Sequence, residues 1–269
     1  MAAATVRRRR SRIAFFRAPF AIARNTVGEA IHHMIFQVIL FFGLLFLVAG
    51  TFFTYMAPQE EHKMITDLGL SIITAFGMLM ALYLGIYTIQ PEIERRTIYA
   101  LLAKPVKRWE FVMGKYLGAL VVLLVTVAVM GAVLLATLYI REGLLSYPLL
   151  TAVLTTSMAL GMMLAVIIMI STVASPLMTI IASVVIWILG YLQSYLKQLA
   201  DHAEQVASKV ALETFNTILP NIELFDIRVN VVDNLPISVG YLLQMARYGL
   251  LYTAVVLILA FIFFNEKQV

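Results

Sequence analysis

Few residues in this sequence have the type and spacing that catalysis or metal binding requires. There is no cysteine, which excludes thiolate metal sites and cysteine nucleophiles. The sequence contains no G-x-x-x-x-G-K-[ST] phosphate loop, no G-x-S-x-G elbow and no H-E-x-x-H zinc pair. Gly114-Lys115-Tyr116 lacks both the upstream glycine and the following serine or threonine of a phosphate loop. We therefore expect no catalytic residue and no metal or cofactor site in this chain.

Three local patterns could still bind a metal ion, and each has a simpler explanation. His32 and His33 are adjacent, so on a helix they point about 100° apart and make a poor shared site; we expect them at a membrane interface. The carboxylates and histidine at residues 57–67 fit a solvated loop. Met158 and Met162 share a helical face and could conduct Cu(I), but methionine is a common, adaptable apolar filler.

One charged segment, Glu92–Lys115, stands between two uncharged apolar runs, Leu68–Pro91 and Tyr116–Ile140. It holds six of the 20 basic and three of the 15 acidic residues. Within it, residues 97–103 place three apolar side chains on one helical side, and Pro105 stops that helix. A short, partly apolar helix between two membrane spans has the shape to dock into a groove on a partner protein.

The composition indicates which elements must hold this segment. Of 269 residues, 62% are hydrophobic and 13% are charged, whereas soluble chains carry about 25% charged residues. Apolar runs of roughly 18 residues or more can cross a hydrocarbon core of about 30 Å. We therefore predict an all-α polytopic membrane protein with six transmembrane helices. The expected spans are about 31–55, 68–90, 116–140, 149–170, 176–196 and 239–264.

Two amphipathic segments flank these spans. Residues 13–29 alternate apolar and basic character and predict an interfacial helix that binds anionic lipid. We expect residues 1–30 to form a cytoplasmic basic arm with this helix, and residues 31–269 to form one transmembrane domain. Lys197–Leu219 has helical apolar spacing with a polar face. It predicts one helix on the outer side that ends near Pro220. Its candidate surface for an extracytoplasmic partner is Lys197, Asp201, Glu204, Lys209 and Glu213.

The spans themselves suggest packing rather than ion transport. Gly77, Ala81 and Gly85 are spaced by four residues, a pattern typical of close helix–helix contact in membranes. Ionisable residues deep in a span usually mark proton or ion paths, and the first five expected spans carry no Asp, Glu, Lys or Arg. This argues against a proton-coupled pump.

The distribution of basic residues predicts the orientation. With both termini in the cytoplasm, fourteen basic residues lie inside, seven of them in the N-terminal arm and six in the Glu92–Lys115 segment. Five or six lie outside. We therefore expect a multi-pass protein of a prokaryotic plasma membrane with the charged segment in the cytoplasm.

Glu92–Gly118 resembles the first cytoplasmic loop of ABC-2-type ABC transporter permeases. The matching pattern is an acidic start, a threonine, a leucine pair, a proline followed by an arginine, and a closing Gly-Lys-x-x-Gly. The resemblance implies a permease subunit that pairs with a second copy as a homodimer, and with two ATP-binding subunits that hold ATP and Mg²⁺. The segment would then be the coupling helix that contacts the ATPase. Its residues would be Glu92, Glu94, Arg95, Arg96, Thr97, Leu101, Leu102, Pro105 and Arg108.

The sequence leaves three functions open. The first is ATP-driven export, for which uncharged spans suit lipid-like or amphipathic substrates slightly better than ions. The second is transmission of the ATPase stroke to an extracytoplasmic protein without transport. The third is a membrane anchor or scaffold with no ATPase partner. None of the three involves nucleic acid.

Overall fold

The computed structural model describes residues 19–53, 61–94, 108–142, 147–202, 206–232 and 237–266. These residues are helical with short connections, and none of them is in a β-strand. After an N-terminal helix, Pro19–His32, the long helices are α2 (Met34–Phe53), α3 (Glu61–Glu94), α5 (Arg108–Glu142), α6 (Tyr147–Val173) and α11 (Val239–Glu266). The shorter ones between α6 and α11 are α7 (Pro176–Tyr191), α8 (Gln193–Asp201), α9 (Val206–Ile218), η2 (Glu223–Phe225) and α10 (Arg228–Val232).

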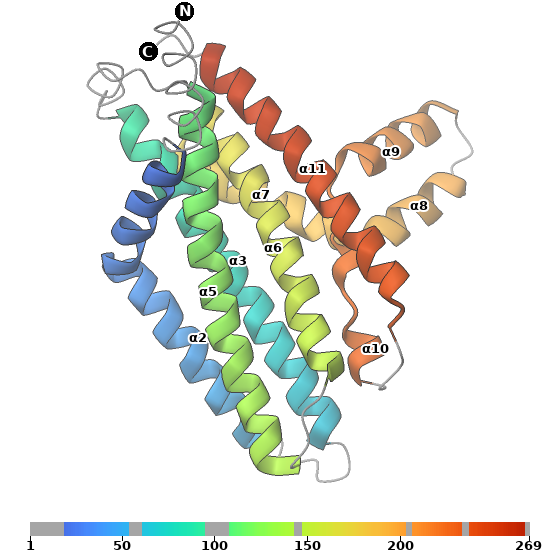
Figure 1. Cartoon of the computed structure of the whole chain (residues 1–269). Coiled ribbons are helices and arrows are strands. Elements are labelled where there is room, and N and C mark those ends of the chain that lie inside the picture. Colours follow the sequence, from blue (N-terminus) through green and yellow to red (C-terminus); the bar gives the residue numbers. More distant parts are fainter. Residues whose placement is uncertain are drawn as a thin grey trace, which may run out of the picture.

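The bundle is built around α6. This helix packs against α3, α5 and α11, while α2 packs against α3, and Figure 1 shows α11 crossing the bundle beside α6. Every residue from 159 to 168 in α6 is buried. Lipid tails are as apolar as these side chains, so close packing rather than water exclusion must hold the helices together in a membrane.

Glycines of α3 provide that close packing, as the four-residue spacing predicted. A Cβ added at Gly77 would collide with Leu160 of α6, and one added at Gly85 would meet Ile167. Ala81 is fully buried between them. The small-residue face of α3 therefore lies directly against α6, and the sequence interpretation of these positions is confirmed.

Several helices are long and apolar enough to cross a membrane. Four single helices meet this description within the described residues, and six spans result if each of two bent helix pairs counts as one. The first pair is the N-terminal helix and α2, which meet at His33 with a 65° bend. A helix over residues 13–29 was expected before the first span; the structure has a separate helix at Pro19–His32, and its position at the membrane interface stays a prediction. The all-helical, multi-span class is confirmed.

The second bent pair corrects the expected fifth span at 176–196. Helix α7 ends at Tyr191, and the chain turns by 66° into α8. The backbone N–H of Leu192 donates to the carbonyl of Leu189, which closes α7 with a tight final turn. Sixteen residues reach about 24 Å at 1.5 Å each, so α7 alone is shorter than the hydrocarbon core.

The prediction of a single helix over Lys197–Leu219 was wrong. Helices α8 and α9 pack against each other. The Gln193 side chain at the start of α8 donates to the carbonyls of Asn216 and Leu219 at the end of α9, at 3.3 and 3.2 Å. The two helices therefore form an antiparallel hairpin. The apolar spacing was correct for each half, but it gave no sign that the chain reverses.

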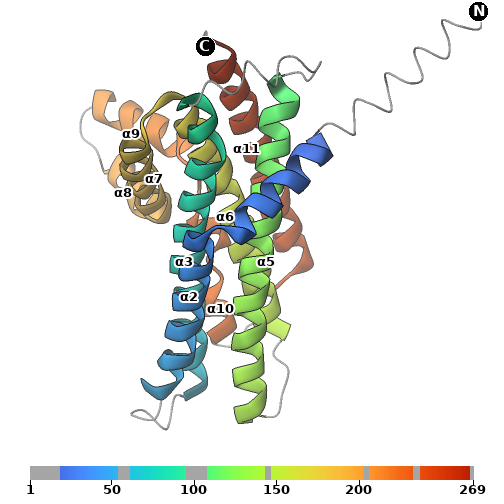
Figure 2. The ribbon, with the colours of Figure 1, turned by 90° about the vertical axis from the view of Figure 1, so that its left-hand side faces the viewer.

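The position of this hairpin also differs from the expected one. Figures 1 and 2 both show α8 and α9 at the flank of the bundle, beside the half that contains the C-terminal end of α3 and the N-terminal end of α5. The sequence placed this segment beyond the opposite end. The short helix α10, which follows the hairpin, lies toward that opposite end.

Candidate functional site

The charged segment Glu92–Lys115 continues the helices on both of its sides. Helix α3 runs through Pro91 to Glu94, and α5 begins at Arg108, so both helices are longer than their expected spans. Glu92 and Glu94 thus lie in the last turn of α3, and Arg108 opens α5. The remaining residues expected to contact an ATPase lie outside the described residues: Arg95, Arg96, Thr97, Leu101, Leu102 and Pro105.

The Gly-Lys-x-x-Gly end of this segment forms the crossing point of two helices. A Cβ at Gly114 would lie 2.8 Å from the Pro19 carbonyl oxygen and from Ile22 Cβ. A Cβ at Gly118 would lie 2.7 Å from the Ala23 carbonyl oxygen and from Thr26 Cβ. The N-terminal helix therefore lies across the first turns of α5, as Figure 2 shows. Both glycines are required because any side chain would separate the two backbones.

Three elements meet around the lysine between the two glycines. Lys115 Nζ lies 3.9 Å from Glu29 Oε2 on the N-terminal helix, and its side chain is 6% exposed. The same ammonium lies 5.6 Å from the centre of the Phe111 ring, a geometry that favours a cation–π contact. Phe111 in turn stacks on Phe264 of α11 at 5.8 Å. The N-terminal helix, α5 and α11 therefore meet at the end of the bundle where α5 begins.

A different contact holds the end of α3. The buried Gln90 side chain donates to the carbonyl of Ala174 at 2.8 Å and to that of Ser171 at 3.5 Å. These carbonyls belong to the last turn of α6 and the connection to α7, where no further helical N–H can reach them. Movement of the end of α3 would therefore act on α6 and α7, whereas movement of α5 would act on the N-terminal helix and α11.

These contacts surround the segment whose sequence resembles a coupling loop. Residues 21–269 match the family model of the ABC-2 family transporter protein. The chain belongs to this family. No curated protein matches the chain. The match begins inside the N-terminal helix and covers all the described helices after it, so the helix that crosses Gly114 and Gly118 is part of the family domain.

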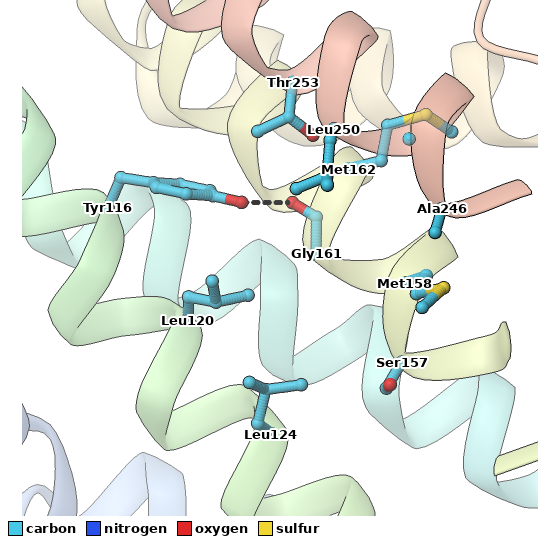
Figure 3. Close-up of a pocket in the computed structure, with 11 residues that line it drawn as sticks. Tyr116, Leu120, Leu124, Ser157, Met158, Gly161, Met162, Ala246, Leu250 and Thr253 are labelled. Atoms are coloured by element: carbon cyan, nitrogen blue, oxygen red, sulfur yellow. Dashed lines mark hydrogen bonds between the residues drawn. The ribbon is translucent and has the colours of Figure 1, made fainter. Parts of the chain in front are cut away.

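The ABC-2 chain also has a pocket between α5, α6 and α11, next to the Gly-Lys-x-x-Gly crossing. Figure 3 shows side chains of all three helices around a common space, which has a volume of about 220 Å³. The Tyr116 hydroxyl donates to the Gly161 carbonyl at 3.3 Å across one side of it. The lining residues are Tyr116, Leu120, Leu124, Ser157, Met158, Gly161, Met162, Ala246, Gly249, Leu250 and Thr253.

Residues 219–232 pack into the bundle. Gly190, near the end of α7, has no room for a Cβ beside the Pro220 carbonyl and Ile222, and its own carbonyl accepts from the Ile222 N–H at 3.1 Å. Further along, Arg228 pairs with Asp226 at 3.1 Å and donates to Ser71 of α3 at 2.8 Å. The sequence signal for this contact was the pair of opposite charges, Asp226 and Arg228, two residues apart.

The polar residues expected to bind an extracytoplasmic partner lie on both helices of the hairpin. Lys197 and Asp201 are exposed on α8, and Lys209 and Glu213 are exposed on α9, where they form an i, i+4 pair at 4.0 Å. Glu204 lies outside the described residues. Within the described part of the chain, no three His, Asp or Glu side chains are placed to hold a metal ion.

Proposed function

We propose that this chain is the permease subunit of an ABC transporter that uses ATP hydrolysis by separate subunits to export a lipid-like or amphipathic substrate. The observation that carries the proposal is the junction of Gly114, Lys115 and Gly118 with the N-terminal helix, directly after the segment that resembles a coupling loop. The complex would contain two ATP-binding subunits and a second permease copy, as the family generally does.

The orientation in this proposal rests on two observations. Pro19 and Phe264, near the two ends of the described chain, both contact the beginning of α5. Both ends therefore lie on the same side of the bundle as the Glu92–Lys115 segment. The basic residues concentrate in the N-terminal arm and in this segment, so the positive-inside rule places that side in the cytoplasm, where ATP is available.

The proposed coupling has two routes. A stroke of the ATPase against the coupling helix would reach α6 and α7 through Gln90, and would reach the N-terminal helix and α11 through Lys115 and Phe111. Gln90 donates to backbone carbonyls, and the Phe111 and Phe264 rings are stacked. A displacement at these two contacts would therefore pass to the partner helix rather than be absorbed by side-chain rotation.

The test is co-purification of the chain with the candidate ATPase, followed by ATPase and lipid-export assays in proteoliposomes. Leu101→Asp and Arg96→Glu should abolish association or ATPase stimulation. If both variants leave association and stimulation unchanged, the coupling assignment fails. Absence of any ATPase partner would favour the anchor or scaffold function. Stimulation without movement of lipid would favour transmission of the stroke to an extracytoplasmic protein.

A further inference from the structure

The pocket between α5, α6 and α11 opens sideways from the bundle. Its rim residues are exposed, with Leu250 at 72%, Leu124 at 40% and Met158 at 39%, whereas Met162 at its base is buried. All lining residues belong to helices that are long and apolar enough to cross a membrane. At this depth the surrounding medium is hydrocarbon, so whatever fills an open crevice must come from it or from another protein.

The side chains that line the pocket favour an apolar ligand. No charged residue lines the pocket. Tyr116 donates to the Gly161 carbonyl at 3.3 Å, and Ser157 donates to the Leu154 carbonyl at 2.7 Å. The third lining hydroxyl, Thr253, is hydrogen-bonded with Tyr116. These hydroxyl protons are therefore already engaged within the protein. A lipid headgroup or a polar solute would lose its own hydrogen bonds on entering, and that loss opposes binding. Apolar cavities also tend to stay free of water.

The small volume of the pocket favours a ligand that is narrow and flexible. Its volume is about 220 Å³. A helix of a second protein is about 10 Å across with its side chains and does not fit between α5 and α11. Met158 and Met162 line the pocket, and methionine adjusts its shape to irregular apolar partners.

We propose that this pocket binds one acyl chain of a phospholipid from the surrounding bilayer. The chain enters between Leu124 and Leu250 and reaches toward Met162 at the buried base. Binding depends on packing against α5, α6 and α11, because hydrocarbon gains little from leaving other hydrocarbon. The inference does not depend on ATP coupling, so it stands or falls separately from the proposed function.

The experiment uses the full chain in lipid nanodiscs that contain a phosphatidylcholine with a photoactivatable diazirine in one acyl chain. After irradiation, crosslinked peptides are identified by mass spectrometry. We expect crosslinks concentrated on the pocket segments of α5, α6 and α11, well above those on the exposed apolar face of α7. Uniform labelling of all lipid-facing helices would overturn the proposal.

Matched variants separate the pocket from the general surface. Leu124→Trp places an indole at the rim and should reduce pocket crosslinks to the level of the α7 face. Leu117→Trp is the control, since Leu117 lies two turns earlier on α5 and has the same 40% exposure but does not line the pocket; it should leave the crosslinks unchanged. Equal effects of the two variants, or no effect of either, would overturn the proposal.

A second pair of variants keeps the test valid if Leu124→Trp fails to fold. Ala246 lines the pocket, whereas Ala254 is exposed on the same helix outside the pocket lining. Ala246→Trp should therefore remove the pocket crosslinks and Ala254→Trp should retain them, with both variants eluting as monodisperse protein. Retention of the crosslinks in a folded Ala246→Trp variant would overturn the proposal.

Discussion

At Gly118, the missing side chain is what allows the N-terminal helix to lie against α5. A Cβ there would lie 2.7 Å from the Ala23 carbonyl oxygen, and backbone cannot yield as a flexible side chain can. Gly28, on the N-terminal helix, has no atom within 4 Å of its Cβ position. Two helical glycines within the same junction therefore have opposite steric requirements.

Gly118→Ala is expected to destabilise the protein by about 1–3 kcal/mol, the usual cost of overpacking a close contact. Gly28→Ala is the control and should be neutral or stabilising, by up to about 1 kcal/mol, since alanine favours a helix more than glycine does. Thermal unfolding of purified protein measures both. Equal shifts in Tm for the two variants would contradict the contact.

Gln90 has a comparable role at the end of α3. Gln90→Leu should cost about 1–3 kcal/mol, because it leaves the Ala174 and Ser171 carbonyls without the side-chain donor. It should also reduce ATPase stimulation if α3 acts on α6 and α7 through this contact. Gln37→Leu on the exposed face of α2 is the matched control. A Gln90 variant with unchanged Tm and unchanged stimulation would exclude this route.

At the scale of elements, the break between α7 and α8 determines where the hairpin of α8 and α9 lies beside the bundle. Gln193, next to the break, is 6% exposed and donates to both Asn216 and Leu219. The Ser194 N–H donates to Glu223 at 2.8 Å. These partners lie more than 20 residues later in the chain, so they stabilise α8 only once the chain has turned back.

Spin labels at Lys197→Cys and Glu213→Cys test the hairpin directly, and the chain has no native cysteine that would add background. A single helix over Lys197–Leu219 would place the two sites about 24 Å apart along its axis, at 1.5 Å per residue. The antiparallel hairpin brings α8 and α9 side by side and should give a much shorter distance in pulsed electron spin resonance. A distance near the single-helix value would refute the hairpin.

At the scale of the whole molecule, the described ends of the chain and the charged segment share one end of the bundle, while α6 begins at the other. Tyr147, the first residue of α6, is 79% exposed. The proposed orientation therefore predicts opposite accessibility for these two ends in intact cells.

Tyr147→Cys should react with a membrane-impermeant maleimide in intact cells, because it would face the outside. Thr97→Cys, in the expected coupling segment, should react only after the cells are permeabilised. Labelling is read by a mass shift of the purified chain. The reverse pattern would show that the orientation is inverted, and it would remove the ATPase contact from the proposed function.

The sequence by itself determined the helical membrane class, the family, and the small-residue contact of Gly77 and Gly85 with a neighbouring helix. These follow from apolar run length and from a four-residue period, which depend on residues close together in the chain. The expected ATPase-contact residues stay a prediction, since most of them lie outside the described residues.

Only the tertiary structure decided where the chain reverses and which helices meet. The hairpin of α8 and α9 and the crossing of Gly114 and Gly118 by the N-terminal helix depend on partners 20 to 100 residues away in the chain. The pocket of Tyr116, Gly161 and Leu250 likewise joins three separate helices. In a membrane, an apolar side chain can contact lipid or protein at similar free energy. Hydrophobicity therefore marks the spans but cannot select which faces pack together.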